Sequence, residues 1–179
     1  MSPDQEGHRT RSSQLRQRAS AFAAAFLDLS NNPPEKLLSE HFVSSNPRIT
    51  EHGPAWATSK LPFLGKTFTG KDGCVQYFSL LADTLEFLPS KDTFPQPQGI
   101  VVDAEAVGPD EEADRQGRGR GVVSLVGRAV FKSVRTGKSW EEQFAYRLSG
   151  FDDEGKIGHW EVWADPLSAW MAVEGRDVP

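Results

Sequence analysis

The sequence predicts an α+β fold in which one curved antiparallel sheet packs against helices on one side. Three observations lead to this prediction. Apolar residues recur at helical spacing in the first half of the chain, and they mainly alternate with polar residues in the second half. The length of 179 residues fits a single domain. Hydrophobic residues make up 37% of the chain and charged residues 25%, which is typical of a globular protein with one core.

Two helices are expected near the N-terminus. The first covers residues 11–29, where the apolar positions at helical spacing are Leu15, Ala19, Phe22, Phe26 and Leu29. Residues 1–11 carry no such pattern and are predicted to form a disordered tail, so the single domain is expected over residues 12–175. The second helix follows, with Asn32 as its N-cap and Pro33 at its first helical position.

A short strand and a third helix are expected next. Residues 48–52 are predicted to form the strand, which a Gly-Pro pair ends. Thr69, with Asp72 three residues later, resembles a capping box and predicts a helix that runs to about residue 85.

The remaining chain is predicted to form strands. Their expected ranges are 98–107, 121–132, 139–149 and 156–165, followed by a short helix over 166–174. A turn at Thr136 and Gly137 joins the two long strands and places Lys132 opposite Glu141. The stretch 108–121 is polar and rich in glycine, which predicts a mobile loop.

Glu142 is the first candidate for chemistry. Strand alternation places it on the same face as Trp140, Phe144, Tyr146 and Leu148. A carboxyl group in apolar surroundings tends to keep its proton, which suits a general acid. The alternative is that Glu142 lies close to the turn and reaches water.

Three further candidates lie at the ends of strands. One of Glu51 and His52 should point toward the helices, and a histidine suits acid–base work near neutral pH. The alternative is that His52 faces solvent. In the last strand, His159 and Asp165 share one face. Asp165 also stands directly before Pro166, where a helix N-cap is expected.

The last strand also predicts a homodimer or, as the alternative, a pocket on its polar face. It carries Trp160 on one face and Trp163 on the other. A strand with two apolar faces is usually covered on both, by the core on one side and by a neighbouring subunit on the other.

Composition and charge argue against several functions. The 20 basic and 25 acidic residues give a net charge of −5, which argues against a nucleic-acid-binding surface. No apolar run is long enough to span a bilayer, and the lone Cys74 forms no disulfide framework. We therefore expect a cytoplasmic protein without nucleic-acid or membrane partners. No phosphate-cradling glycine pattern and no metal-ligand spacing are present, so neither a cofactor nor a metal is expected.

Two stretches resemble a known family. They are LPFLGKTFTGKDGCVQYFSLLADTL at 61–85 and EEQFAYRLSGFDDEGKIGHWEVWADPLSAW at 141–170. Both are similar to SnoaL-like proteins of the nuclear-transport-factor-2-like superfamily. The resemblance implies a cone-shaped sheet wrapped around one long and two shorter helices, often in a dimer. It also implies that the first strand, the strand of Glu142 and the last strand supply the polar groups of a pocket.

The expected function follows from these residues and from the resemblance. Relatives include ketosteroid isomerases, scytalone dehydratases, polyketide cyclases, limonene epoxide hydrolases and many proteins without catalysis. We expect a cofactor-independent isomerase, cyclase or dehydratase for a polyketide- or terpenoid-like hydrophobic molecule, with His52 as base and Glu142 or Asp165 as acid. His159 is a further catalytic candidate. The expected pocket-lining residues are Phe22, Trp56, Phe63, Phe78, Tyr146 and Trp163. The alternative is a non-catalytic dimeric domain that binds a hydrophobic ligand or a protein.

Overall fold

The computed structural model describes residues 3–108 and 120–178, in which one curved sheet of seven strands packs against helices. The strands are β1 (Arg48–His52), β2 (Lys66–Thr69), β3 (Leu85–Leu88), β4 (Val101–Asp103), β5 (Val122–Ser133), β6 (Ser139–Ser149) and β7 (His159–Trp163). Their order across the sheet is β2-β1-β7-β6-β5-β3, and β4 also pairs with β5. The predicted α+β class is therefore confirmed.

The sheet is mixed, and here the prediction of an antiparallel sheet needs correction. β1 runs parallel to β7, with Thr50 opposite Glu161 and His52 opposite Trp163, whereas every other named pair is antiparallel. Parallel neighbours require a long crossover connection, and here α3 and five strands lie between the two partners. The alternation within each strand carries no information about such a distant partner.

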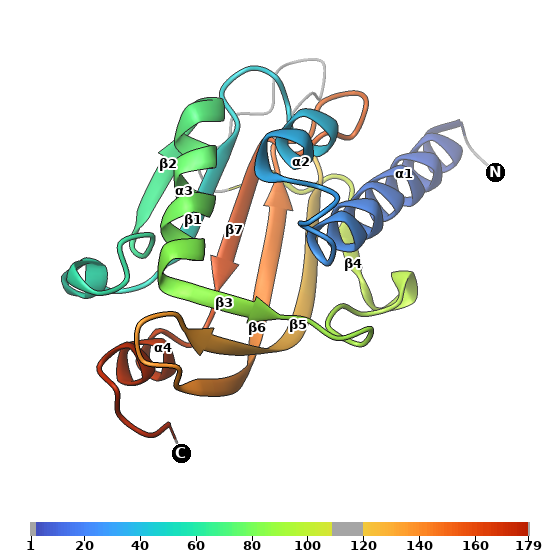
Figure 1. Ribbon diagram of the computed structural model, residues 1–179. Coiled ribbons are helices and arrows are strands. Elements are labelled where there is room, and N and C mark those ends of the chain that lie inside the picture. Colours follow the sequence, from blue (N-terminus) through green and yellow to red (C-terminus); the bar gives the residue numbers. More distant parts are fainter. Residues whose placement is uncertain (1–2, 109–119, 179) are drawn as a thin grey trace.

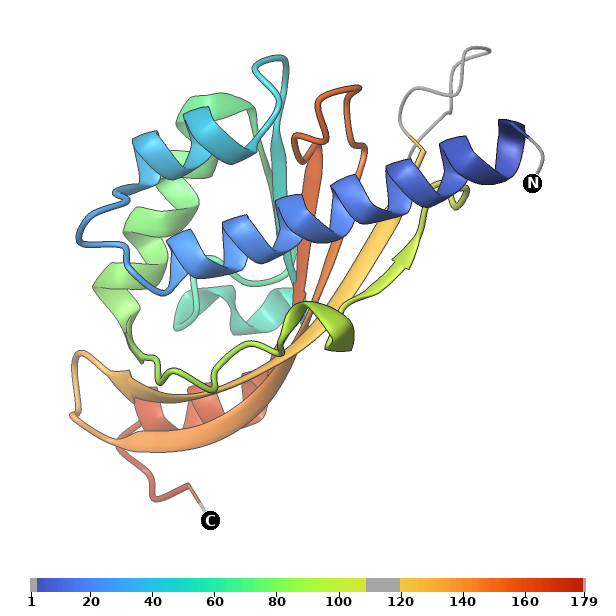
Figure 2. The same cartoon turned by 90° about the vertical axis from the view of Figure 1, so that its right-hand side faces the viewer.

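The helices are α1 (Pro3–Phe26), α2 (Pro34–His41), α3 (Gly70–Thr84) and α4 (Pro166–Val173), with short 3-10 turns at Ala55–Ser59 and Pro97–Gly99. The first three helices lie on the concave side of the sheet, which curls beneath them (Figures 1 and 2). α4 packs against β5 and β6 near the hairpin turn that joins them (Figure 1). Within the described ranges, no helix is both long enough and apolar enough to cross a membrane.

The first two helices begin at other residues than expected. α1 begins at Pro3, so most of the segment predicted as a disordered tail is helical; Pro3 suits a first helical position and no later proline interrupts α1. Arg11 further on donates from Nη2 to the Asp152 carbonyl oxygen at 2.9 Å. α2 begins after Pro33, because the Asn32 side chain donates to the Asp28 carbonyl oxygen instead of capping α2.

The strand predicted over 98–107 is shorter than expected. Only β4 is extended there, because the Asp103 carboxylate accepts the backbone N–H groups of Glu105 and Ala106 and turns the chain. The long hairpin also has another register: Lys132 lies opposite Ser139, not Glu141, because the turn contains four residues between Ser133 and Lys138. Most of the predicted mobile loop, residues 109–119, lies outside the described residues.

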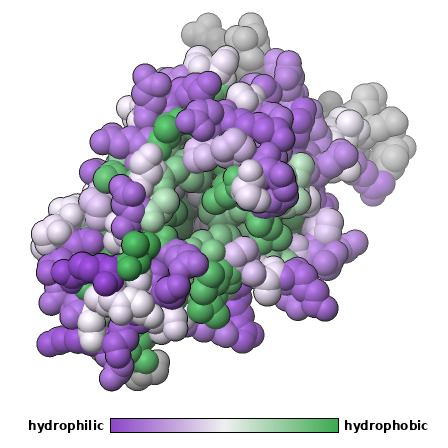
Figure 3. All heavy atoms as spheres, viewed as in Figure 1, coloured by the Kyte–Doolittle hydropathy of each residue, from purple (hydrophilic) through white to green (hydrophobic). Residues whose placement is uncertain are grey.

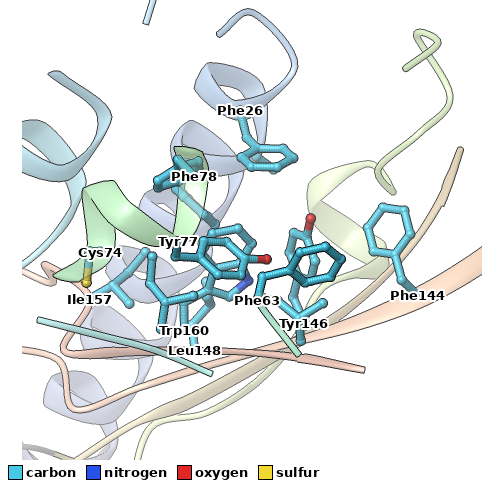
Figure 4. Packing of buried hydrophobic residues seen from close by; sticks show 14 of the residues in the cluster. Phe26, Phe63, Cys74, Tyr77, Phe78, Phe144, Tyr146, Leu148, Ile157 and Trp160 are labelled. Atoms are coloured by element: carbon cyan, nitrogen blue, oxygen red, sulfur yellow. The ribbon is translucent and has the colours of Figure 1, made fainter. Parts of the chain in front are cut away.

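The core is centred on Trp160 of β7, which is fully buried. Its ring contacts Phe22 and Phe26 of α1 at centroid distances of 5.3 and 5.4 Å. On its other sides it contacts Tyr77 of α3 and Tyr146 of β6 (Figure 4). The helices and the concave face of the sheet therefore share one aromatic core, and the candidate site lies at its edge.

Candidate functional site

A cavity lies between the concave face of the sheet and the C-terminal half of α3. Its volume, counted as the space that the centre of a water molecule can occupy, is about 50 Å³. One water molecule needs roughly 10–15 Å³ by this measure, so the cavity holds a few water molecules. Most of its wall is apolar, and its carboxyl and hydroxyl groups come from Glu51, Tyr77, Glu142, Tyr146 and Asp165.

Glu51 lies on β1 and is buried. Ile49, two residues earlier, is fully buried on the same face, so alternation directs the Glu51 side chain to the concave side. The Tyr77 hydroxyl donates to Glu51 Oε2 at 2.7 Å. Burial raises the pKa of Glu51 to about 7, the hydrogen bond from Tyr77 opposes this shift, and the charge of Glu142 adds to it.

Glu142 lies on β6 among the aromatic residues that share its face. Trp140 Nε1 donates to Glu142 Oε2 at 2.7 Å. Burial raises the pKa of Glu142 to about 7, the bond from Trp140 opposes the shift, and the charge of Asp165 adds to it. Two carboxyl groups on different strands therefore titrate near neutral pH in one cavity.

Two tyrosines complete the polar part of the site. Tyr77 comes from α3 and points toward Tyr146 of β6 (Figure 4). Both are buried, and burial raises the pKa of each hydroxyl well above its ordinary value, so both stay protonated. Tyr77 donates to Glu51, whereas the Tyr146 hydroxyl has no hydrogen-bond partner among residues 3–108 and 120–178. Tyr146 can therefore donate to an oxygen of a ligand.

Asp165 combines two roles in the structure. Its Oδ1 accepts the backbone N–H groups of Leu167 and Ser168, both at 3.0 Å, so it is the N-cap of α4 as the sequence indicated. It also lines the cavity. Because its charge adds to the effect of burial in raising the pKa of Glu142, the cap and the Glu142 carboxyl group are electrostatically linked.

Of the residues expected at the site, the cavity brings together Glu142, Asp165, Phe63 and Tyr146. Phe22 and Phe78 lie instead in the core around Trp160. Trp56 is 67% exposed and packs its ring against Trp170. These three residues pack elsewhere and do not line the cavity.

His52, His159 and Trp163 lie on the convex face. His52 Nε2 and Glu161 Oε1 are 2.9 Å apart, and the His52 ring stacks on Trp163 at a centroid distance of 4.1 Å. His159 Nε2 is 2.8 Å from Thr50 Oγ1. The two histidines therefore stand across the sheet from Glu142, and alternation along β1 and β7 explains why.

The sequence favours His52 over Glu51 as the base and does not single out Tyr77. The signal for Glu51 is the apolar Ile49 two residues before it, which marks the inward face of β1. Tyr77 lies one turn after Cys74 and one turn before Leu81, so it belongs to the buried stripe of α3. A hydroxyl group within such a stripe indicates a buried polar partner.

The curved sheet, the three helices on its concave side and the pocket at their edge define the NTF2-like fold. Solved structures support this assignment. The chain matches an NTF2-like protein from Burkholderia xenovorans with a TM-score of 0.58 and 14% identity, over 90% of this chain and 97% of the other. No protein-family model and no curated protein matches the sequence significantly.

Two further solved structures share the fold. A candidate isomerase from Bacillus subtilis matches with a TM-score of 0.59 and 14% identity, over 94% of this chain and 99% of the other. TerC, co-crystallized with polyporic acid, matches with a TM-score of 0.54 and 15% identity, over 88% and 98%. The fold expected from the resemblance is confirmed, and at these identities the likeness concerns the fold alone.

Proposed function

We propose that this protein is a cofactor-independent enzyme that transfers protons on a small hydrophobic molecule with a carbonyl or hydroxyl group. The observation that carries the proposal is the pair of carboxyl groups, Glu51 and Glu142, whose pKa values lie near 7 in one apolar cavity. Isomerisation, cyclisation or dehydration of a polyketide- or terpenoid-like compound are the reactions that fit. The Bacillus subtilis candidate isomerase and TerC with its polyporic acid support a catalytic or ligand-binding role.

The two carboxyl groups have different roles in the proposed reaction. Because the charge of one raises the pKa of the other, the pair retains about one proton near neutral pH. Tyr77 stabilises the ionised form of Glu51, which suits a base that removes a proton from a carbon next to a carbonyl group. Burial keeps the proton on Glu142 and the charge of Asp165 adds to this effect, which suits an acid that protonates the substrate oxygen.

Tyr146 supplies the remaining interaction. Its hydroxyl can donate to the same substrate oxygen while negative charge develops there. In an isomerisation, Glu51 returns its proton to another carbon, and Glu142 recovers its own proton from the oxygen. His52 and His159 take no part in these proton transfers, because both lie on the convex face.

Proton exchange tests the proposal without knowledge of the natural substrate. We expect the protein to catalyse the incorporation of deuterium from D2O at the carbon next to the carbonyl group of cyclic ketones such as cyclohex-3-en-1-one. NMR measures this incorporation. The pH–rate profile should be bell-shaped around pH 7, and Glu51→Gln or Glu142→Gln should slow exchange by about 10²–10⁴-fold.

Glu141→Gln is the matched control, since Glu141 is exposed and forms an ion pair with Arg128 on the opposite face of the same strand. Equal loss of exchange in Glu141→Gln and Glu142→Gln would contradict the assignment. Carboxyl pKa values near 4.5 for both Glu51 and Glu142 would remove the basis of the proposal.

The second candidate function is a non-catalytic dimeric domain that binds a hydrophobic ligand or a protein. The exposed apolar side chains Val101, Val126 and Trp163 favour it, because they line a shallow depression on the convex face. A binding domain would keep ligand affinity in Glu142→Gln and would show no catalysed exchange in the unaltered protein.

We also propose that the protein forms a homodimer through the convex face. Val126 is 58% exposed and Trp163 41%, and burial of such a patch against a second copy would stabilise a dimer.

We further propose that the protein works in the cytoplasm. Subcellular fractionation tests this location.

A further inference from the structure

An apolar groove adjoins the cavity on the side of the helix ends. It lies between the turn after α1, the last turns of α3 and the start of β3, and it offers about 440 Å³ to the centres of water-sized molecules. The hollow is visible between α3 and the end of α1, with apolar side chains around it (Figure 3). Its volume exceeds that of the cavity several times, although it is open to solvent.

The groove and the cavity share one wall. Phe26, Leu81, Leu85 and Phe87 line both. The rings of Phe26 and Phe87 touch at a centroid distance of 5.3 Å, and Phe87 and Leu81 are only partly buried. The separation between the two spaces is therefore one layer of side chains, and rotamer changes of this layer would join them.

The chemistry of the two spaces differs. The cavity holds the carboxyl and hydroxyl groups, whereas the shared wall and the floor of the groove are apolar. Two carboxylates stand at the rim of the groove, and both are already engaged. Asp28 accepts hydrogen bonds from Ser30 and Asn31, and Glu86 Oε2 lies 2.5 Å from Lys132 Nζ. An anionic group at this rim would meet two carboxylates, so an uncharged occupant fits.

We propose that the groove binds an uncharged apolar arm of the substrate, while the polar head of the same molecule lies in the cavity between Glu51 and Glu142. The inference rests on the proposed function and deepens it. The substrate class is then a ring with a hydroxyl or carbonyl group that carries an apolar extension of several carbon atoms. The helix ends and β3 select the extension, and the acid–base pair acts on the head.

A series of phenol, 4-butylphenol and 4-hexylphenol tests the proposal by isothermal titration calorimetry. Burial of one methylene contributes about 0.8 kcal/mol, so affinity should rise about fourfold for each methylene that enters the groove. Ala82→Trp should fill the groove from an exposed position of α3. We expect this variant to bind phenol like the unaltered protein and to lose the gain from the alkyl chain.

Gln76→Trp is the matched control. Gln76 is also exposed on α3 and lines neither space, so this variant should keep the full dependence on chain length. Tyr146→Phe should weaken all three phenols by the same factor, because it removes a donor to the head and leaves the groove intact.

Several outcomes would overturn the inference. They are an affinity that does not depend on chain length, a dependence that survives Ala82→Trp, or the absence of binding for the whole series. None of them decides the acid–base chemistry, because the measured pKa values of Glu51 and Glu142 and the deuterium exchange of a ketone without an alkyl arm test it separately. If the affinity depends on chain length but the protein catalyses no deuterium exchange, the proposed role of the groove stands and the proposed enzymatic function is rejected.

Discussion

The buried carboxyl pair couples chemistry to stability at the scale of single residues. Glu51 and Glu142 titrate near pH 7 in the folded protein, whereas an unfolded chain releases these protons near pH 4.5. Between these values the folded state binds more protons than the unfolded state, so stability falls as pH rises. The stability from these groups is fully present below about pH 4.5 and is lost as pH rises through about 7.

Glu142→Gln should flatten this dependence. The amide carries no charge, so the variant should lose less stability than the unaltered protein between pH 5 and pH 8, by up to about 3 kcal/mol. Urea unfolding at both pH values measures the difference. Glu141→Gln should change the slope little, and an unchanged slope in Glu142→Gln would argue against a raised pKa at this residue.

Tyr77→Phe should raise the pKa of Glu51 above 7. The hydrogen bond from Tyr77 favours the ionised carboxylate, and its loss leaves burial and the charge of Glu142 to raise the pKa further. The variant should also lose about 1–2 kcal/mol of stability at alkaline pH. Titration by ¹³C NMR of the glutamate carboxyl carbons gives the pKa.

Trp140→Phe is the reciprocal variant. It removes the donor to Glu142 and should raise the pKa of that residue, with a much smaller effect on Glu51. For the Tyr77→Phe variant of the preceding prediction, the contradicting result is a lower pKa of Glu51. It would show that the Tyr77 hydroxyl does not stabilise the Glu51 carboxylate.

The sequence predicts one of the two buried carboxyl groups. Glu142 was predictable because four apolar neighbours at alternate positions define the inward face of its strand. Glu51 and His52 are adjacent at the end of a five-residue strand, and a histidine is the more common acid or base, so the chemical preference outweighed the pattern set by Ile49. A prediction of Tyr77 as a site residue would require knowledge of which strand faces α3.

At the scale of elements, α4 depends on a side chain that also faces the cavity. Asp165 caps α4 and raises the pKa of Glu142, so one residue joins the start of a helix to the electrostatics of the site. Two substitutions can separate these effects, because an asparagine can cap a helix without a charge.

Asp165→Asn should keep the stability of the fold and lower the pKa of Glu142. Asp165→Ala should lower that pKa as well and should cost about 1 kcal/mol of stability, within a range of roughly 0.5–2 kcal/mol. Thermal unfolding and ¹³C NMR measure the two quantities. Equal stability of both variants would mean that the cap contributes little, and an unchanged pKa of Glu142 would mean that the charge of Asp165 is screened.

Long elements were predictable and short or distant ones were not. The alternation over 139–149 gives β6 with its bounds and its inward face. β2 and β3 contain four residues each on either side of α3, too few for a periodic pattern to appear. The sequence predicts a hairpin turn of two residues. The turn in the structure has four, which shifts the register by two, so each side chain keeps its face but has another cross-strand partner.

At the scale of the whole molecule, the two faces of the sheet have different surroundings. The concave face carries the core and the cavity, whereas the convex face exposes the apolar side chains around Val126 and Trp163. His52 and Glu161 interact beside this patch. Association through the convex face would leave the cavity and the groove open to ligands.

Val126→Glu should convert the proposed dimer to a monomer. A carboxylate at the centre of an apolar contact would lose its hydration without a partner, and light scattering should then give the 19.8 kDa mass of one chain instead of twice that mass. Val134→Glu changes an exposed valine in the hairpin turn and should leave the dimer intact. An unaltered protein that is monomeric at micromolar concentrations would contradict the dimer.

The parallel pairing of β1 with β7 determines when the site can form during folding. Thr50 and His159 make contact although 109 positions separate them along the chain. Contacts of such long range slow folding, because closing the long intervening loop costs entropy before the contacts offset it. Until β7 lies between β1 and β6, Glu51 has no fixed place relative to Glu142, and its carboxyl group remains hydrated with an ordinary acidity. The arrangement of the two buried carboxyl groups is therefore completed late in folding: on the ribosome, the chain acquires it only after the last strand has emerged.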